Sequence, residues 1–199
     1  GKPKCIQETH QAIIAHIHGS TQFNDYRPDN VTLNWLPMDH VVPILTFHLK
    51  DTYLGCTQVV AATDQIISRP LRWLELMSEH KVTHSWAPNF GFKLVAEALK
   101  ADDEFTCDLS SLRYLMNAGE QVTKSVVDSF LQQLRPFGVL STVMQPAFGM
   151  AEACTCMTYL NDYDADTSTL FIDKKTLGGK LLPSNPNEHT VGFVNLGTV

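Results

Sequence analysis

Residues 82–100 carry the sequence VTHSWAPNFGFKLVAEALK, and this stretch decides the fold. Residues 82–87 predict a strand, and residues 89–100 predict a helix directly after it. The same pair recurs next in the chain, because residues 112–117 predict a strand and residues 123–134 carry apolar side chains at helical spacing. Strands and helices that alternate in this way predict an α/β fold, with a layered, mostly parallel sheet covered by helices.

The pattern extends toward the N-terminus. Residues 31–36 and 57–62 predict two strands, the second of them buried, and residues 41–54 predict a helix that Gly55 closes. Residues 64–79 have a helical pattern, in which Pro70 fits the first turn of a helix and residues 64–68 form a separate turn. Residues 5–18 predict an amphipathic helix that stops at Gly19, and residues 22–30 predict a surface loop.

The C-terminal part has a different composition. Residues 139–144 predict a strand that ends before Pro146. Beyond about residue 160 the chain is rich in Asp, Thr, Asn and Pro around two short predicted strands, at residues 170–172 and 191–196. We therefore expect an α/β core over residues 1–160 and a β-rich continuation of the same incomplete domain over residues 161–199.

Composition narrows the class of protein. The 199 residues are 44% hydrophobic and 18% charged, which is enough apolar surface for a core. A net charge of −6 without a basic block argues against nucleic acid and against an anionic membrane surface as partners. No apolar run approaches the roughly 18 residues that span a bilayer, so we expect a soluble, cytoplasmic protein. The five cysteines predict reduced, mostly packed thiols.

Several loops that follow predicted strands carry residues suited to a ligand site, since α/β sheets bind ligands at the carboxyl ends of their strands. His40 follows the first strand, Gly119 and Glu120 follow a later one, and residues 148–152 (FGMAE) combine an aromatic ring with the carboxylate of Glu152. An aromatic ring can stack on a nucleobase and a carboxylate can bind Mg²⁺. The alternatives are a helix cap with a partly buried His40, and ordinary strand-to-helix turns.

Pairs of His or Cys residues that could bind a metal ion are less convincing candidates than these loops. His16 and His18 lie two residues apart on a predicted helix and face different sides. Cys154 and Cys156 lack a second Cys or His pair at zinc-site spacing. The sequence therefore predicts no structural zinc site.

Taken in order, the motifs resemble the adenylate-forming superfamily, which includes acyl- and aryl-CoA synthetases, fatty acyl-AMP ligases and the adenylation domains of peptide and polyketide synthetases. Residues 1–4 (GKPK) are similar to the end of its phosphate loop. Residues 35–40 (WLPMDH) are similar to its Trp-Leu-Pro-x-x-His segment, residues 117–120 to its Gly-Glu turn, and residues 148–152 to its Tyr-Gly-x-Thr/Ala-Glu motif. Residues 69–74 (RPLRWL) and 83–90 are similar to the fatty acyl-AMP ligase branch.

The resemblance implies roles for these residues. His40 and Glu152 would be catalytic, with His40 beside the substrate carboxylate and Glu152 holding Mg²⁺. The substrate pocket would include His40, Asn89 and Ala147. The residues that would bind ATP are Lys4 in the phosphate loop, Gly119 and Glu120 beside the adenine, Phe148 stacked on it, and Gly149 and Ala151 in the same motif.

The resemblance also implies a reaction. A carboxylate attacks the α-phosphate of Mg·ATP to give an acyl-adenylate and pyrophosphate, and a phosphopantetheine thiol on a carrier protein then takes the acyl group. Val41 stands where amino-acid-activating relatives have Asp, which implies a carboxylic acid without a conventionally bound α-amino group. The alternatives are a stand-alone acyl- or aryl-CoA ligase, an amino-acid-activating domain, and a non-catalytic nucleotide- or partner-binding α/β module.

The resemblance covers nearly the whole chain but only part of the family's machinery. The start of the phosphate loop, the ribose-binding Asp segment, the hinge and the C-terminal domain with its catalytic Lys would lie outside these residues. We therefore expect an internal piece of a larger enzyme, a polyketide or peptide synthetase, that does not turn over alone.

Overall fold

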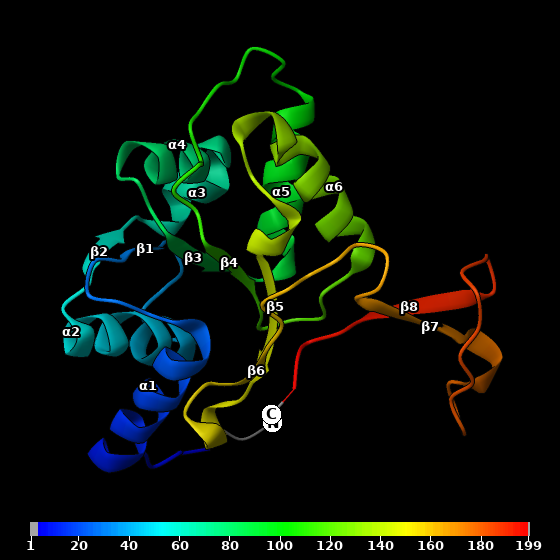
Figure 1. Ribbon diagram of the computed structural model, residues 1–199, viewed down its shortest axis with the longest axis horizontal. Coiled ribbons are helices and arrows are strands. Elements are labelled where there is room, and N and C mark those ends of the chain that lie inside the picture. The colour runs from blue at the N-terminus through cyan, green and yellow to red at the C-terminus, as the bar shows by residue number, and fades with distance from the viewer. Residues whose placement is uncertain (1–3, 199) are drawn as a thin grey trace.

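A computed structural model describes residues 4–198 (Figure 1). Residues 1–3, which belong to the expected end of the phosphate loop, lie outside the described residues. A six-stranded sheet with the order β2-β1-β3-β4-β5-β6 forms the centre, and β6 is antiparallel to β5 whereas the other neighbours are parallel. The strands are β1 (Val31–Asn34), β2 (Thr57–Val60), β3 (His84–Ala87), β4 (Tyr114–Asn117), β5 (Met144–Gly149) and β6 (Cys156–Tyr159).

Helices cover both faces of this sheet (Figure 1). One face carries α3 (Thr63–Ser68), α4 (Leu71–Glu79), α5 (Asn89–Lys100) and α6 (Lys124–Leu134). The other carries α1 (His10–Asn24), the π-helix η1 (Val42–Leu49) and α2 (Lys50–Leu54). Short 3-10 turns are η2 (Arg135–Phe137), η3 (Ser141–Val143), η4 (Ala151–Ala153) and η5 (Lys174–Thr176), and an antiparallel hairpin of β7 (Thr169–Asp173) and β8 (Thr190–Val194) follows the sheet.

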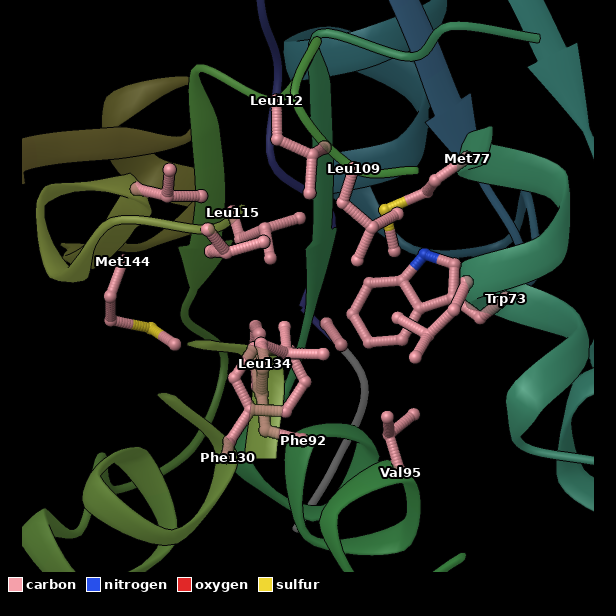
Figure 2. Packing of buried hydrophobic residues seen from close by; sticks show 14 of the residues in the cluster. Trp73, Met77, Phe92, Val95, Leu109, Leu112, Leu115, Phe130, Leu134 and Met144 are labelled. Carbon is pink, nitrogen blue, oxygen red and sulfur yellow. The ribbon is translucent and has the colours of Figure 1, made fainter. Parts of the chain in front are cut away.

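The main core fills the space between the sheet and α4, α5 and α6 (Figure 2). Phe92 and Phe130 meet edge to face with ring centroids 4.9 Å apart, and Trp73 packs against Phe92 at 5.5 Å. The Trp73 indole N–H donates to Ser85 Oγ at 2.9 Å, so this buried side chain is also satisfied as a donor. These contacts fix the helical layer that lies behind the candidate site.

A second, smaller cluster lies on the opposite face, because side chains alternate across each strand. Leu115 belongs to the main core and its neighbour Met116 to the second cluster. The buried members of the second cluster are Val42, Phe47, Trp86, Met116, Ala118, Ala147, Cys156 and Tyr159. This cluster lies beneath the residues that follow β1 and β5.

The predicted fold class is confirmed, and the boundaries of several elements differ. The helix predicted over residues 5–18 is α1, which begins after Thr9, continues through Gly19 and ends at Asp25. Thr9 Oγ1 accepts from Ala12 N at 3.1 Å and caps the helix, whereas Gly19 has open space around it and no need to end a helix. The prediction of a loop from residue 22 was therefore wrong for residues 22–24.

The strand predicted over residues 57–62 is shorter and is not buried. It is β2, the edge strand of the sheet, and Val60 is 66% exposed. The helix predicted over 41–54 is present, although its first part is a π-helix, and Gly55 closes it at a φ of 78°. Pro70 precedes the first residue of α4, and α3 forms the separate turn before it.

The strand predicted over residues 139–144 was wrong. Residues 141–143 form η3, and β5 begins at Met144 and passes through Pro146. Proline lacks an N–H but keeps its carbonyl, and the Pro146 carbonyl accepts from Leu160 N at 2.9 Å. A proline can therefore lie within this strand, although the sequence-based prediction ended the strand before Pro146. Within residues 4–198, none of the helices combines the length and the apolar character needed to cross a membrane.

Candidate functional site

The candidate residues lie in loops that leave one edge of the sheet. Strand register places Ala87 opposite Asn117, and Asn117 opposite Pro146. Because β1, β3, β4 and β5 are parallel, their carboxyl ends share this edge. The strand order reverses between β1 and β3, and such a switch point is where open α/β sheets bind ligands.

His40 lies in the loop after β1, where its imidazole is exposed. Its Nδ1 accepts from Val42 N at 3.3 Å, and its ring lies over Trp86 with centroids 6.4 Å apart and planes tilted by 27°. Trp86 is fixed in turn, because its indole N–H donates to Asn34 Oδ1 at 2.8 Å. One face of His40 is therefore held by the sheet, and the ring lies at the rim of the second cluster.

Asn89 begins α5 and is buried. Its Nδ2 donates to Thr123 Oγ1 at 3.1 Å, and its Oδ1 accepts from Asn117 Nδ2 at 3.3 Å and from Thr123 N at 3.2 Å. The amide thus joins the loops after β3 and β4. This geometry gives Asn89 a supporting position at the edge, and its assignment to a substrate pocket stays a prediction.

Gly119 and Glu120 lie in the exposed loop after β4. Gly119 has a φ of 90°, which is open to glycine and strained for other residues. Glu120 Oε1 accepts from Phe90 N at 2.5 Å and satisfies one of the free N–H groups at the start of α5. The Glu120 carboxylate therefore joins this loop to the loop after β3 through one oxygen. Its other oxygen is left for a ligand.

Phe148 and Gly149 end β5. The Phe148 ring is 49% exposed. Gly149 lies so close to β6 that a Cβ there would overlap the Thr155 carbonyl oxygen and come within 2.5 Å of Cys156 Cα. The ladder between β5 and β6 shifts register at this point. The glycine thus allows a tight turn that leads the chain from an exposed aromatic ring to η4.

Glu152 lies in η4, beside Ala151, and its carboxylate is exposed. Among the described residues it takes part in neither an ion pair nor a side-chain hydrogen bond. Met150 N donates to the Thr155 carbonyl at 2.9 Å, and Ala153 N donates to the Met150 carbonyl at 3.0 Å, so the loop is closed on itself. This arrangement holds a carboxylate in solvent on an ordered turn.

Lys4 is exposed, and the chain just after it lies against η4 (Figure 1). Cys154 Sγ donates to Glu8 Oε2 at 3.1 Å, which brings the segment that follows Lys4 to the loop that carries Glu152. The thiol is held protonated, because burial and the Glu8 carboxylate raise its pKa to about 11.

Sequence reasoning missed part of this site. It left out Asn34 and Trp86, which hold His40, although Trp86 belongs to the stretch that decides the fold. It weighed His16 and Cys154 as metal ligands, favoured a packed thiol for Cys154, and gave neither residue a place in this site. Among residues 4–198 no cluster of three or more Cys, His, Asp or Glu side chains is arranged to hold a metal ion. Pairing of residues about 140 positions apart, as for His16 and Cys156, leaves no local pattern in a sequence.

Sequence comparison with known proteins finds related enzymes. The family model described as AMP-binding enzyme matches residues 1–185. Microperfuranone synthase from Emericella nidulans is 33% identical over 159 residues, which are 80% of this chain and 17% of that protein. The medium-chain fatty acid–[acyl-carrier-protein] ligase JamA from Moorena producens is 31% identical over 76% of this chain and 26% of its own length.

Solved structures give the same result. The adenylation domain of a keto acid-selecting NRPS module, bound to keto acyl adenylate, superposes with a TM-score of 0.93 at 34% identity. The match covers 98% of this chain and 36% of that one, so the chain spans about a third of that structure and a smaller share of the curated relatives. The match to the family model over most of the sequence confirms the resemblance to adenylate-forming enzymes, and the chain belongs to the AMP-binding enzyme family.

Proposed function

We propose that the protein that carries this chain uses ATP to convert a carboxylic acid into an acyl-adenylate and then passes the acyl group to a phosphopantetheine thiol on a carrier protein. One observation carries the proposal. The loops after β1, β4 and β5 leave one edge of the sheet and bear an imidazole, a glycine turn, an exposed aromatic ring and an exposed carboxylate. Adenylate formation needs such groups, because it depends on positioning and on charge neutralisation.

We propose the residue roles that the resemblance implies, and the placement of these residues supports them. Phe148 would stack on the adenine, and Gly119 and Glu120 would border it, with Gly149 and Ala151 allowing close approach. Glu152 would hold Mg²⁺, which fits the ion's preference for one or two carboxylates together with phosphate oxygens and water. Lys4 would bind phosphate oxygens, and His40 would border the acid's carboxylate.

The substrate class is proposed to be a carboxylic acid without an α-ammonium group, and specifically an α-keto acid. The cluster beneath His40, Ala147 included, consists of uncharged side chains, and Asp39 is exposed to solvent. An α-ammonium bound there would lack the carboxylate that a desolvated cation needs. The keto acid-selecting adenylation domain, at 34% identity, supports the same class.

The acceptor is proposed to be a carrier protein, with support from the relative whose name states an acyl-carrier-protein acceptor. We further propose that residues 1–160 form an α/β core and that residues 161–199 continue the same domain. Because the chain spans 36% of the matching adenylation-domain structure, we expect catalysis to need residues beyond these 199.

The test is pyrophosphate exchange in the full protein that carries these residues. Panels of α-keto acids, fatty acids, aryl acids and amino acids would each be supplied with Mg·ATP and labelled pyrophosphate. We expect exchange with α-keto acids and little with the matching amino acids. Loading of a phosphopantetheinylated carrier protein, followed by intact mass, then compares the carrier with coenzyme A as acceptor.

Each alternative has its own outcome. Pyrophosphate exchange with an amino acid alone would contradict the proposed substrate class. Faster acyl transfer to coenzyme A than to the carrier protein would contradict the proposed acceptor. Nucleotide binding without exchange for any acid would favour a non-catalytic binding module. We expect the Glu152→Gln variant to lose exchange at low Mg²⁺ and to regain part of it as Mg²⁺ is raised.

A further inference from the structure

The loop that carries Glu152 is held from outside by the N-terminal segment. The loop runs from Met150 to Cys156, between β5 and β6, and two residues that follow Lys4 contact it. Glu8 contacts its middle and His16 contacts its end. These contacts join two segments that are about 140 positions apart in the sequence.

The contact in the middle of the loop is between Glu8 and Cys154. The thiol donates to Glu8 Oε2 at 3.1 Å, and Cys154 is buried while Glu8 is half-buried. Cys154 has a φ of 64° and a ψ of −67°, and Thr155 N donates to the Ala153 carbonyl at 2.9 Å across it. This is a γ-turn, which is strained for a residue with a Cβ and persists only where its surroundings hold it.

The contact at the end of the loop is made by His16 on α1. Its Nε2 lies 3.0 Å from the Cys156 carbonyl oxygen and 3.4 Å from Thr155 Oγ1, and Thr46 Oγ1 donates to the same Thr155 hydroxyl at 2.7 Å. This end of the loop is therefore fixed by α1 and η1 independently of Glu8. At the γ-turn next to Glu152, the side-chain hydrogen bond of Cys154 is made to Glu8.

We propose that Glu8 is a positioning residue, which fixes the Glu152 loop against the segment that carries Lys4 through its hydrogen bond with the Cys154 thiol. The inference rests on the proposed function, since it concerns the two segments assigned to Mg²⁺ and phosphate. If the loop moved relative to Lys4, the position of Mg²⁺ at Glu152 would no longer match the position of the phosphates at Lys4. Loss of the hydrogen bond should therefore weaken the binding of Mg·ATP and leave the binding of the acid unchanged.

The test compares variants at both ends of the hydrogen bond in the full protein that carries these residues. Glu8→Leu and Cys154→Ala remove it, whereas Glu8→Gln keeps an acceptor and Cys154→Ser keeps a donor. We expect the first pair to raise KM for Mg·ATP about three- to tenfold, the value of one hydrogen bond. We expect KM for the acid to stay within about twofold and the second pair to resemble the wild type. Glu97→Leu, an exposed glutamate on α5, is the matched control.

Two further variants separate positioning from folding. Cys154→Gly relieves the strained backbone, so we expect an unchanged or higher melting temperature together with the raised KM for Mg·ATP. The double variant Glu8→Leu/Cys154→Ala should be no worse than either single variant, because both remove one interaction. Additive effects, or an unchanged KM for Mg·ATP in Glu8→Leu, would overturn the proposal.

Failure of the proposed function gives a different result. If the wild type shows no pyrophosphate exchange with any acid, the proposed function is wrong. The positioning of the loop is then measured by amide hydrogen exchange instead. The amides of Met150 and Ala153, which close the loop, should exchange faster in Glu8→Leu than in Glu8→Gln. Equal exchange in the two variants would show that Glu8 does not hold the loop.

Discussion

Gly149 shows how one residue decides the shape of the site. Its backbone lies against β6, and a methyl group there would meet main-chain atoms of Thr155 and Cys156, which cannot rotate away. The structure gives a reason for a glycine at this position, which is the close approach of two strands.

We therefore expect Gly149→Ala to lower the free energy of unfolding by about 1 to 3 kcal/mol, as overpacking does. Gly178→Ala is the control, because a Cβ at Gly178 meets nothing within 4 Å. Urea denaturation of both variants measures the difference. Equal stability of the two variants would mean that the turn can shift at little cost.

His84 is a buried histidine of β3 to which the proposed function gives no role. Burial and the positive charges of Lys50 and Arg113 lower its pKa to about 3. Its Nδ1 lies 2.7 Å from Thr83 Oγ1, and its ring packs edge to face on Tyr26 at 5.2 Å. The imidazole is therefore neutral in the folded protein.

This predicts a pH dependence of stability. Between about pH 6.5 and 3 the unfolded chain binds a proton at His84 that the folded chain does not, so stability is lost as the pH falls through this window. The slope reaches about 1.4 kcal/mol per pH unit for one proton. His84→Phe keeps the ring packing, and its free energy of unfolding should fall less steeply than that of the wild type between pH 7 and 5. Parallel curves would contradict the assignment.

At the scale of one element, α2 contains a buried ion pair, and a hydrogen bond from Thr32 of β1 joins this pair to the sheet. Lys50 Nζ lies 2.7 Å from Asp51 Oδ1, the Thr32 hydroxyl donates to Asp51 Oδ2 at 2.5 Å, and both charged side chains are almost fully buried. The Lys50 ammonium also lies 4.1 Å from the centre of the Tyr26 ring. A charge that is buried in this way is stable only while its partner is present.

We expect Lys50→Met to lower the free energy of unfolding by about 3 to 5 kcal/mol, because it leaves the Asp51 carboxylate buried without a counter-charge. The double variant Lys50→Met/Asp51→Leu should recover much of that loss. Lys81→Met, which breaks the exposed pair with Asp108, should cost far less. Thermal unfolding of the three variants tests the order, and a double variant no more stable than Lys50→Met would contradict it.

The elements differ in how far the sequence predicts them. The β–α pair at residues 84–100 was predicted almost to the residue, because local propensity and burial agree there. Gly19 and Pro146 misled the prediction, because each has a local preference that tertiary packing overrides. Most residues predicted for the site lie at one edge, because they follow parallel strands, whereas Lys4 lies in the segment before α1. The contacts of Glu8 and His16 with the β5–β6 loop depend on the folded chain and were beyond prediction.

At the scale of the whole molecule, stability is uneven. All four residues of β3 are buried, and the main core lies against the middle of the sheet. The β7–β8 hairpin contributes Ile172 and Val194 to the interior, while Leu170 and Phe193 are exposed. Few buried apolar contacts make local opening easier.

We therefore expect native-state hydrogen exchange to be faster for amides of β7 and β8 than for those of β3 and β4. The ladder amides of the hairpin should open locally, whereas those of β3 should exchange only on global unfolding. Equal protection across the two sheets would show that residues 161–199 unfold together with the α/β core.

The strand order has a consequence for how the chain is made. β1 lies between β2 and β3, and Thr32 of β1 pairs with His84 of β3, which comes 52 residues later in the chain. A nascent chain that has emerged only as far as residue 80 can close the β1–β2 side and must leave the other side of β1 open. After β3 arrives, each later strand of the sheet adds to the growing edge in order, β4, β5 and then β6. Synthesis thus adds strands at one edge of the sheet, and the open edge of β3 is covered only when residues 114–117, which form β4, leave the ribosome.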